Sequence, residues 1–390
     1  SGGTTSAALN GGDGNDLLTA GLGGGVVHGD GGNDSLMAQS NANVLYGDAG
    51  NDTLSGGTTS AALNGGDGND MLFSGTAGGA IHGNGGNDTL FGSNIAGTLY
   101  GDDGDDSLTA LSNNNAIYGG AGNDTISGGA VASLILRGGD GNDWMLAGSG
   151  GGWLSGEKGN DTLIGSEGPC LVEGNDGNDS LSGYSGGGQF FGGAGDDTLF
   201  GERGHVLLYG GDGNDLLEAG SGVATLDGGN GDDRLSLVNT GSAFGGAGND
   251  SINGGLDGDI LQGGTGADRL TGVSGADTFI FVAGDSTTVL SEMDTITDFT
   301  SGSDKINAGV SGTAANTFIS STKVASYADA LDQASNSITA GTKDIVVVRV
   351  SGGLDLGTYV FVDSLGRNEI SVAIKLTGAD TPLKFTDFGT

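Results

Sequence analysis

Basic residues are scarce in this chain, and their shortage excludes several kinds of partner. Only 12 of the 390 residues are lysine or arginine, against 49 aspartate and glutamate residues, and the formal net charge is −37. A chain with this charge repels nucleic acids and anionic membranes, whereas small cations are its natural partners. We therefore expect no nucleic-acid partner.

Proline, cysteine and long apolar runs are also rare or missing. The chain has 87 glycines but only 2 prolines and shows no three-residue period, so a collagen-like triple helix is excluded. Cys170 is the single cysteine, so no disulfide can form within the chain. Because no run of about 18 apolar residues is present, we expect no transmembrane helix and no membrane insertion.

The acidic residues that are present follow a fixed period. The string SGGTTSAALNGGDGND occupies residues 1–16 and occurs again at 55–70, which indicates duplication of a block of three periods. Turns of the type GGDGND end in an aspartate that recurs every 18 residues, with one spacing of 19 and one of 17. This main row comprises Asp16, Asp34, Asp52, Asp70, Asp88, Asp106, Asp124, Asp143, Asp161, Asp179, Asp197, Asp215, Asp233, Asp250 and Asp268. Near its end the spacing halves, and Asp259 and Asp277 form a short second row.

Apolar residues keep the same period. One stands two positions after almost every aspartate, as at Leu18 and Leu36, and a second row falls half a period later, as at Val27 and Leu45. One period therefore reads turn, short strand, turn, short strand, and glycine every few residues disfavours helices. The sequence predicts an all-β fold: a parallel β-roll, or β-helix solenoid, of 18-residue coils whose like strands stack into two parallel sheets.

The aspartate turns match the nonapeptide GGxGxDxUx, in which U is apolar. Over residues 1–285 the sequence resembles the RTX, or hemolysin-type, calcium-binding repeat family. In that family a calcium ion lies between like turns of adjacent coils. The resemblance implies that all seventeen aspartates of the two rows are calcium ligands, and that the roll holds roughly 15 ions if every gap is filled.

The sequence departs from the usual RTX pattern at the alternate half-repeats. Strings such as GLGGGVVH (21–28) and GTAGGAIH (75–82) lack the aspartate. We therefore expect calcium along one edge of the roll only, with Asp259 and Asp277 restoring the second edge. A change at Asn115, in an opposite turn, should leave the calcium stoichiometry unaltered.

Residues 286–390 lack the repeat and form the second predicted domain. Apolar residues at helical spacing predict a helix over 326–338, and DIVVVRV (344–350), GTYVFVD (357–363) and EISVAIKLTG (369–378) predict three strands. This tail resembles the C-terminal region of RTX proteins exported by type I secretion, including surface-layer proteins. The resemblance implies a mostly-β cap with a secretion signal, and an extracellular or cell-surface location.

No motif of an enzyme is evident, and the zinc motif HExxH is missing. The favoured function is a calcium-binding extracellular structural protein, a surface-layer or cell-surface fibre subunit, which folds and assembles on binding Ca²⁺ after secretion. The alternative is the C-terminal calcium and export module of a larger secreted enzyme, toxin or adhesin. A cell-surface polysaccharide is a further candidate partner, because Trp144 and Trp153 could stack on a sugar.

One outward row carries many aromatic and histidine side chains, whereas the other outward rows are mostly serine and threonine. This aromatic row comprises His28, Tyr46, Asn64, His82, Tyr100, Tyr118, Arg137, Ser155, Glu173, Phe191, Tyr209, Asp227 and Phe244. Two interpretations stay open: the row is a surface for self-association into a lattice or fibre, or its rings only shield the thin sheet by pairing along the ladder.

Overall fold

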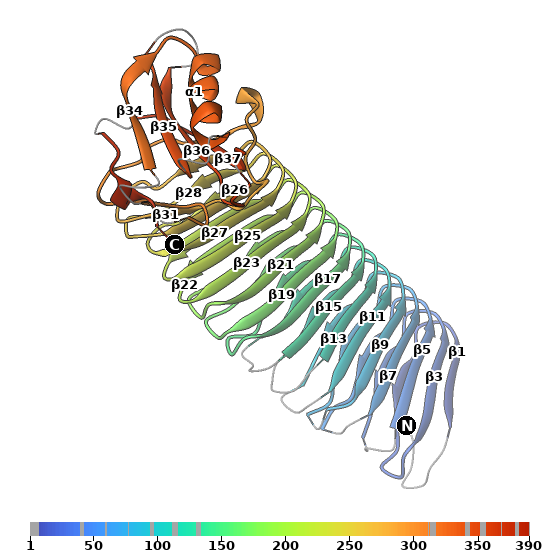
Figure 1. Cartoon of the computed structure of the whole chain (residues 1–390). Coiled ribbons are helices and arrows are strands. Elements are labelled where there is room, and N and C mark those ends of the chain that lie inside the picture. Colours follow the sequence, from blue (N-terminus) through green and yellow to red (C-terminus); the bar gives the residue numbers. More distant parts are fainter. Residues whose placement is uncertain are drawn as a thin grey trace. The chain divides into compact units, whose positions relative to one another are not determined.

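The computed structural model describes residues 8–39, 43–58, 61–76, 78–93, 97–110, 116–129, 134–310, 312, 317–339, 344–351, 356–367, 369–378 and 382–389. The chain divides into two compact units, Ser1–Ala194 and Gly195–Thr390. The first unit is blue to green in Figure 1 and the second is green to red. Asn115 lies outside the described residues.

The first unit is a solenoid in which every coil contributes one long and one short strand (Figure 1). The long strands are β1 (Leu9–Asp13), β3 (Gly25–Gly31), β5 (Asn43–Ala49), β7 (Ala62–Asp67), β9 (Ala80–Gly85), β11 (Thr98–Asp103), β13 (Ala116–Ala121), β15 (Leu134–Asp140), β17 (Gly152–Lys158), β19 (Cys170–Asp176) and β21 (Gly188–Ala194). The short strands are β2 (Leu17–Thr19), β4 (Ser35–Met37), β6 (Thr53–Ser55), β8 (Met71–Phe73), β10 (Thr89–Phe91), β12 (Ser107–Thr109), β14 (Thr125–Ser127), β16 (Trp144–Leu146), β18 (Thr162–Ile164) and β20 (Ser180–Ser182).

Like strands of successive coils pair in parallel, with each residue opposite the one a period later. Leu45 faces Leu63 in the long-strand sheet, and Leu54 faces Leu72 in the short-strand sheet. All four side chains are fully buried, so each short strand places one apolar side chain in the thin core. These two ladders confirm the predicted all-β solenoid of about 18-residue coils.

The extra and the missing residue behind the irregular spacings of 19 and 17 lie outside the aspartate turns. In the first unit Ile126 faces Met145 and Ile117 faces Leu136, which places the extra residue in the half-turn between Ile126 and Leu136. The half-turns without aspartate therefore absorb length changes, and the aspartate turns keep one length.

The second unit begins with the same architecture. Its roll strands are β22 (Thr198–Arg203), β23 (Val206–Asp212), β24 (Leu216–Ser221), β25 (Ala224–Asn230), β26 (Arg234–Ser236), β27 (Gly241–Ala247), β28 (Ser251–Asn253), β29 (Ile260–Thr265), β30 (Arg269–Thr271) and β31 (Thr278–Ile280). Two later strands extend the roll beyond residue 285: β32 (Asp294–Ile296) pairs with β30, and β33 (Lys305–Asn307) pairs with β31.

The remaining elements follow the last coils of the roll. They are the 3₁₀ turns η1 (Leu290–Glu292) and η2 (Phe385–Asp387), the strands β34 (Thr317–Val324), β35 (Ile345–Val350), β36 (Gly357–Val362) and β37 (Val372–Leu376), and the helix α1 (Tyr327–Thr339). β37 pairs in parallel with β32 and antiparallel with β36, so a paired strand occupies an edge that would otherwise invite aggregation.

Helix α1 packs on this terminal sheet. Its Tyr327, Ala330 and Ile338 belong to one buried cluster with Val348 and Tyr359. The helix and three of the strands agree with the sequence prediction, whereas β34 was not predicted. No helix in the described part of the chain is long and apolar enough to cross a membrane.

Candidate metal sites

Each aspartate turn is a six-residue bend whose second place requires a left-handed backbone. Gly66 has φ 120° at this place, and Asp48 and Asn175 take the same region with φ 70° and 81°. Aspartate and asparagine visit this region more readily than other residues with a side chain, whereas glycine visits it freely. Most turns therefore carry glycine, aspartate or asparagine here, although Glu157 and Val273 also take this region, with φ 80° and 71°.

The last aspartate of each turn points into the roll and bonds the preceding coil. The backbone N–H of Asp34 donates to Asp52 Oδ1 at 2.7 Å, and that of Asp106 donates to Asp124 Oδ1 at 2.8 Å. Both acceptor side chains are buried. One carboxylate oxygen of each residue is thus used to hold neighbouring coils together.

The other carboxylate oxygen is the candidate metal ligand. Among the described residues, a buried Oδ2 atom without a hydrogen-bond partner recurs in coil after coil of each unit. These atoms belong to Asp34, Asp52, Asp70, Asp88, Asp106, Asp124, Asp143 and Asp161 in the first unit, and to Asp215, Asp233, Asp250, Asp268 and Asp294 in the second. A buried polar atom without a partner costs free energy, and a buried charge costs more. A bound cation or a proton would therefore stabilise these buried oxygens.

A backbone carbonyl of the next coil faces the same space. A Cβ atom at Gly29 would overlap both Asp34 Oδ2 and the carbonyl oxygen of Gly47, the equivalent glycine one coil later. Gly65 stands in the same relation to Asp70 Oδ2 and the Gly83 carbonyl. Glycine at the first place therefore leaves room for a carboxylate and a carbonyl oxygen from adjacent coils to converge.

Burial and mutual repulsion change the acidity of the row. Burial raises the pKa of the Asp70 carboxyl to about 7; the backbone N–H of Asp52 lowers it, and the charges of Asp88 and Asp52 raise it. Asp106 and Asp143 are affected in the same way, and their pKa values are also about 7. At neutral pH these carboxyl groups are therefore only partly ionised, unless a bound cation stabilises the charged form.

The donor set suits calcium. In the part of the chain that the structure describes, no group of three or more His, Cys, Asp or Glu side chains gathers at one point. Backbone carbonyls must therefore supply most of the ligands beside the aspartates. Calcium takes six to eight oxygens, backbone carbonyls included, at flexible geometry, whereas zinc prefers nitrogen and sulfur.

The other predicted residues of the main row lie where the pattern places them. Asp16 is at the start of the row, and its N–H donates to Asp34 Oδ1 at 2.7 Å. Asp179 accepts from the Asp161 N–H at 2.7 Å in the first unit, and the Asp197 N–H donates to Asp215 at 2.8 Å in the second. Both Asp179 and Asp197 are buried.

The short row lies on the long-strand side of the second unit and differs from the main row. The Asp259 N–H donates to Asp277 Oδ1 at 2.9 Å, so these two stack as predicted. Both oxygens of Asp259 accept backbone N–H groups, from Gly241 at 2.8 Å and from Gly255 at 2.5 Å. Asp259 therefore has less need of a cation than the aspartates of the main row.

Two further aspartates that belong to the main and short rows were not identified from the sequence. Asp294 extends the main row, because its Oδ1 accepts the Asp268 N–H at 2.9 Å, and Asp304 extends the short row, because it accepts the Asp277 N–H at 3.2 Å. They follow after 26 and 27 residues, so a search at a spacing of 18 does not reach them. Each is nonetheless followed two positions later by a buried isoleucine, Ile296 or Ile306, and this signal could have identified them.

The opposite edge of the first unit carries almost no acid. Its half-turns contain no aspartate, and Glu167 is their one acidic residue. Together, the fold and the row of buried carboxylates define a calcium-binding parallel β-roll.

The comparison with protein families agrees with this class of protein. The chain belongs to the family of the RTX calcium-binding nonapeptide repeat, whose model matches more than half of it. The matched segments are residues 1–27, 28–58, 62–77, 80–94, 100–132, 135–154, 146–168, 171–187, 191–226, 244–279 and 253–287. Proteins with these repeats bind calcium and are typically exported by type I secretion.

Comparisons with individual proteins add little. A search of the curated proteins gives no match. Among solved structures, the chain is similar to the AlgE6R3 subunit of the mannuronan C5-epimerase from Azotobacter vinelandii, with 25% sequence identity over 40% of this chain and 78% of that one. The TM-score is 0.28, so this likeness carries no argument about function.

A single substitution tests whether the main row of aspartates binds the calcium. Asp124→Asn keeps the size of the side chain but removes the charged oxygen that borders two gaps between coils, and we expect about two calcium ions fewer per chain. Glu167→Gln removes the same charge at the opposite edge and should leave the stoichiometry unchanged. Isothermal titration with calcium measures both, and an equal loss in the two variants would contradict the assignment of the row.

Proposed function

We propose that this protein is an extracellular structural subunit, of a surface layer or a cell-surface fibre, that folds and assembles when it meets calcium after secretion. The seventeen aspartates predicted from the sequence, with Asp294 and Asp304, serve as its calcium ligands and hold roughly 15 ions. The observation that carries this proposal is the succession of buried carboxylate oxygens without partners, which makes a long roll depend on a cation.

The C-terminal part is proposed to close the roll and to direct export. The pairing of β37 with β32 supports the capping role. We place the functional boundary near residue 285, where the regular repeat ends, with β32 and β33 as irregular last coils.

The outward aromatic row supports the proposal that this protein assembles. In the first unit the rings of His82 and Tyr100 stack at 4.4 Å, and those of Tyr100 and Tyr118 at 5.1 Å. His28 stacks on Tyr46 at 4.8 Å and also bonds Asp48 at 2.9 Å. Stacking along the ladder protects the inner faces of the rings, but all of these residues keep exposed surface that another molecule could cover.

The outer face of the short-strand sheet is less polar than expected. Serine and threonine were predicted there, yet Met37, Met71, Phe73 and Trp144 are exposed on it by 37% to 49%, and Phe73 stacks on Phe91 at 5.1 Å. Met71 and Trp144 stand directly after Asp70 and Asp143, and they are exceptions within the row that the prediction considered. Met37 and Phe73 lie two positions further along, where the same face is presented again and which the prediction left out.

The assembly proposal has a direct test. A variant with Tyr46, Tyr100, Tyr118 and Tyr209 changed to serine should fold in calcium but lose the ability to form sheets or fibres, as seen by electron microscopy. The matched control changes Met37, Met71, Phe73 and Phe91 to serine. If only the control fails to assemble, the contact lies on the short-strand face. Assembly by both variants, as by the wild type, would exclude both surfaces.

The alternative, an export module of a larger secreted protein, predicts a different native mass. A few coils suffice for such a module, and the length of this roll therefore favours the structural role. Mass spectrometry of the protein from its native source distinguishes the two functions, since a module would be found attached to a further domain.

A sugar partner is also proposed, but not at Trp153. The Arg137 guanidinium lies over that indole ring at 4.8 Å, and the indole N–H donates to Glu173 at 2.9 Å. The ring is therefore already engaged by its neighbours.

A further inference from the structure

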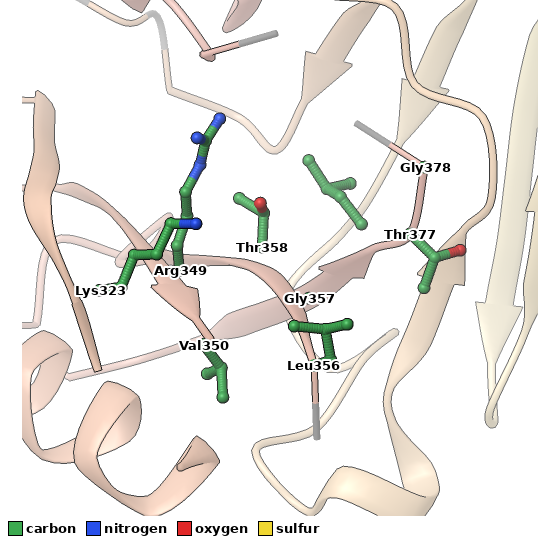
Figure 2. A pocket seen from close by; sticks show the side chains of 9 residues that line it. Lys323, Arg349, Val350, Leu356, Gly357, Thr358, Thr377 and Gly378 are labelled. Carbon is green, nitrogen blue, oxygen red and sulfur yellow. The ribbon is translucent and has the colours of Figure 1, made fainter. Parts of the chain in front are cut away.

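The C-terminal part of the second unit contains a cavity of about 280 Å³ with two cations on its wall. Figure 2 shows it beside the ends of strands β34 to β37. The residues that matter for its chemistry are Lys323, Arg349, Leu356, Thr358, Leu376 and Thr377.

The strand register brings the two cations together. Lys323 of β34 lies opposite Arg349 of β35, Arg349 lies opposite Thr358 of β36, and Thr358 lies opposite Leu376 of β37. Residues in register project from the same face of a sheet. Lys323 and Arg349 are thus neighbours on one face, next to a hydroxyl, as Figure 2 shows.

This juxtaposition is unfavourable by itself. Like charges directly opposite each other on paired strands destabilise a sheet. The chain has only 12 basic residues and 49 acidic ones, so a carboxylate would be the usual neighbour of Lys323. Among the described residues, however, no carboxylate forms an ion pair with Lys323. An anionic ligand would remove this repulsion.

The rest of the wall indicates what carries the anion. A guanidinium and an ammonium group bind carboxylate, phosphate or sulfate through charge-assisted hydrogen bonds. Thr358 and Thr377 add hydroxyl groups, whereas Leu356 and Leu376 add apolar surface. A bare inorganic ion leaves the apolar surface of the wall without a partner. A sugar ring also offers hydroxyls and C–H surface, and the small volume suits a single residue of it.

We propose that this pocket binds one acidic sugar residue, a sugar that carries a carboxylate, phosphate or sulfate group, of a glycan at the cell surface. The inference rests on the proposed function for the location of the protein among such glycans, and it assigns the anchoring contact to the C-terminal part. A second copy of the chain is the competing occupant, but its acidic turns are stacked about 4.8 Å apart as a continuous ridge, which does not enter a small cavity.

The test uses the full chain folded in 1 mM calcium, a concentration of about the extracellular level. Three probes are used: a labelled oligosaccharide of glucuronic acid, the monosaccharide glucose 6-sulfate, and a neutral oligosaccharide of glucose. Fluorescence anisotropy or calorimetry measures the binding of each. We expect at least one acidic probe to bind and the neutral one not to bind. The comparison of carboxylate with sulfate identifies the preferred anion.

The variants locate the site. Lys323→Gln together with Arg349→Gln should weaken binding of the acidic probe at least about tenfold, since a hydrogen bond to a charged group contributes more than one to a neutral group. Arg349→Lys keeps the charge without the planar fork and should lose less. Arg367→Gln removes an exposed cation of the same region outside the pocket and should have no effect. Circular dichroism in calcium verifies that each variant is folded.

Several results would overturn the proposal. These are no binding of either acidic probe, an equal loss in Arg367→Gln, or undiminished binding in the double variant, which would place the anion on the calcium ions of the roll. If neither acidic probe binds and the double variant no longer assembles, the occupant of the pocket is a second copy of the chain. Assembly is scored separately by electron microscopy, so a protein that binds the acidic sugar but never assembles keeps the pocket and loses the proposed structural role.

Discussion

Removing calcium should unfold this protein. We expect the β-sheet circular dichroism signal to disappear when a chelator is added at pH 8, because the row of buried carboxylates then has neither a cation nor a proton. At millimolar calcium and dissociation constants of about 0.1–1 mM, each ion stabilises the fold by about 0.4–1.4 kcal/mol. Over about 15 sites this amounts to roughly 6–20 kcal/mol, comparable with the whole stability of an ordinary domain.

The charge balance adds to this effect. The chain carries −37, and about 15 calcium ions would supply about +30. Without calcium the self-repulsion of the acidic chain also opposes the compact state. Magnesium at the same concentration is the control, since it dehydrates reluctantly and needs an octahedral site. A β signal that persists in chelator would refute the dependence on calcium.

Acid should replace calcium in holding the roll together. In chelator, we expect the β signal to be absent at pH 8 and to return as the pH falls, with a midpoint between about 5 and 7. Burial raises the folded-state pKa of Asp88, Asp124 and Asp250 to about 7, from a reference value of 3.8. Because the folded form binds these protons more tightly, their contribution to stability is complete below pH 3.8 and is lost as the pH rises through 7.

The midpoint separates this effect from general neutralisation of the chain. Exposed carboxylates titrate near pH 4, so a midpoint there would attribute refolding to net charge alone. Protons and calcium compete for the same oxygens, so calcium affinity should also fall as the pH drops below 7. Calorimetry at pH 8 and pH 6 measures this competition, and equal affinities at the two values would contradict it.

Together these results would explain how a long acidic chain can be exported. At submicromolar cytosolic calcium the binding contribution is close to zero, so the chain would stay unfolded and able to pass through a channel. Millimolar calcium outside would then allow the coils to form. Since each coil contacts mainly its neighbours, folding can begin at any turn and spread along the roll.

The sequence by itself determined the roll and most of its two rows of aspartates. Every coil repeats the same local contacts, so the partner of Leu45 is the residue one period later, Leu63, and the partner of Asp52 is Asp70. In such a solenoid, spacing along the chain and neighbourhood in space are the same information. The turn glycines and the buried apolar rows could therefore be predicted from the period alone.

The tertiary structure decided what lies beyond the period. Asp294 and Asp304 join the rows only because β32 and β33 pair with the last coils after long, irregular connections. Lys323 and Arg349 become neighbours only through the pairing of β34 with β35 on either side of helix α1. No fixed spacing connects these residues, since their contacts depend on how the terminal sheet packs against the helix, and that packing is a property of the folded chain as a whole.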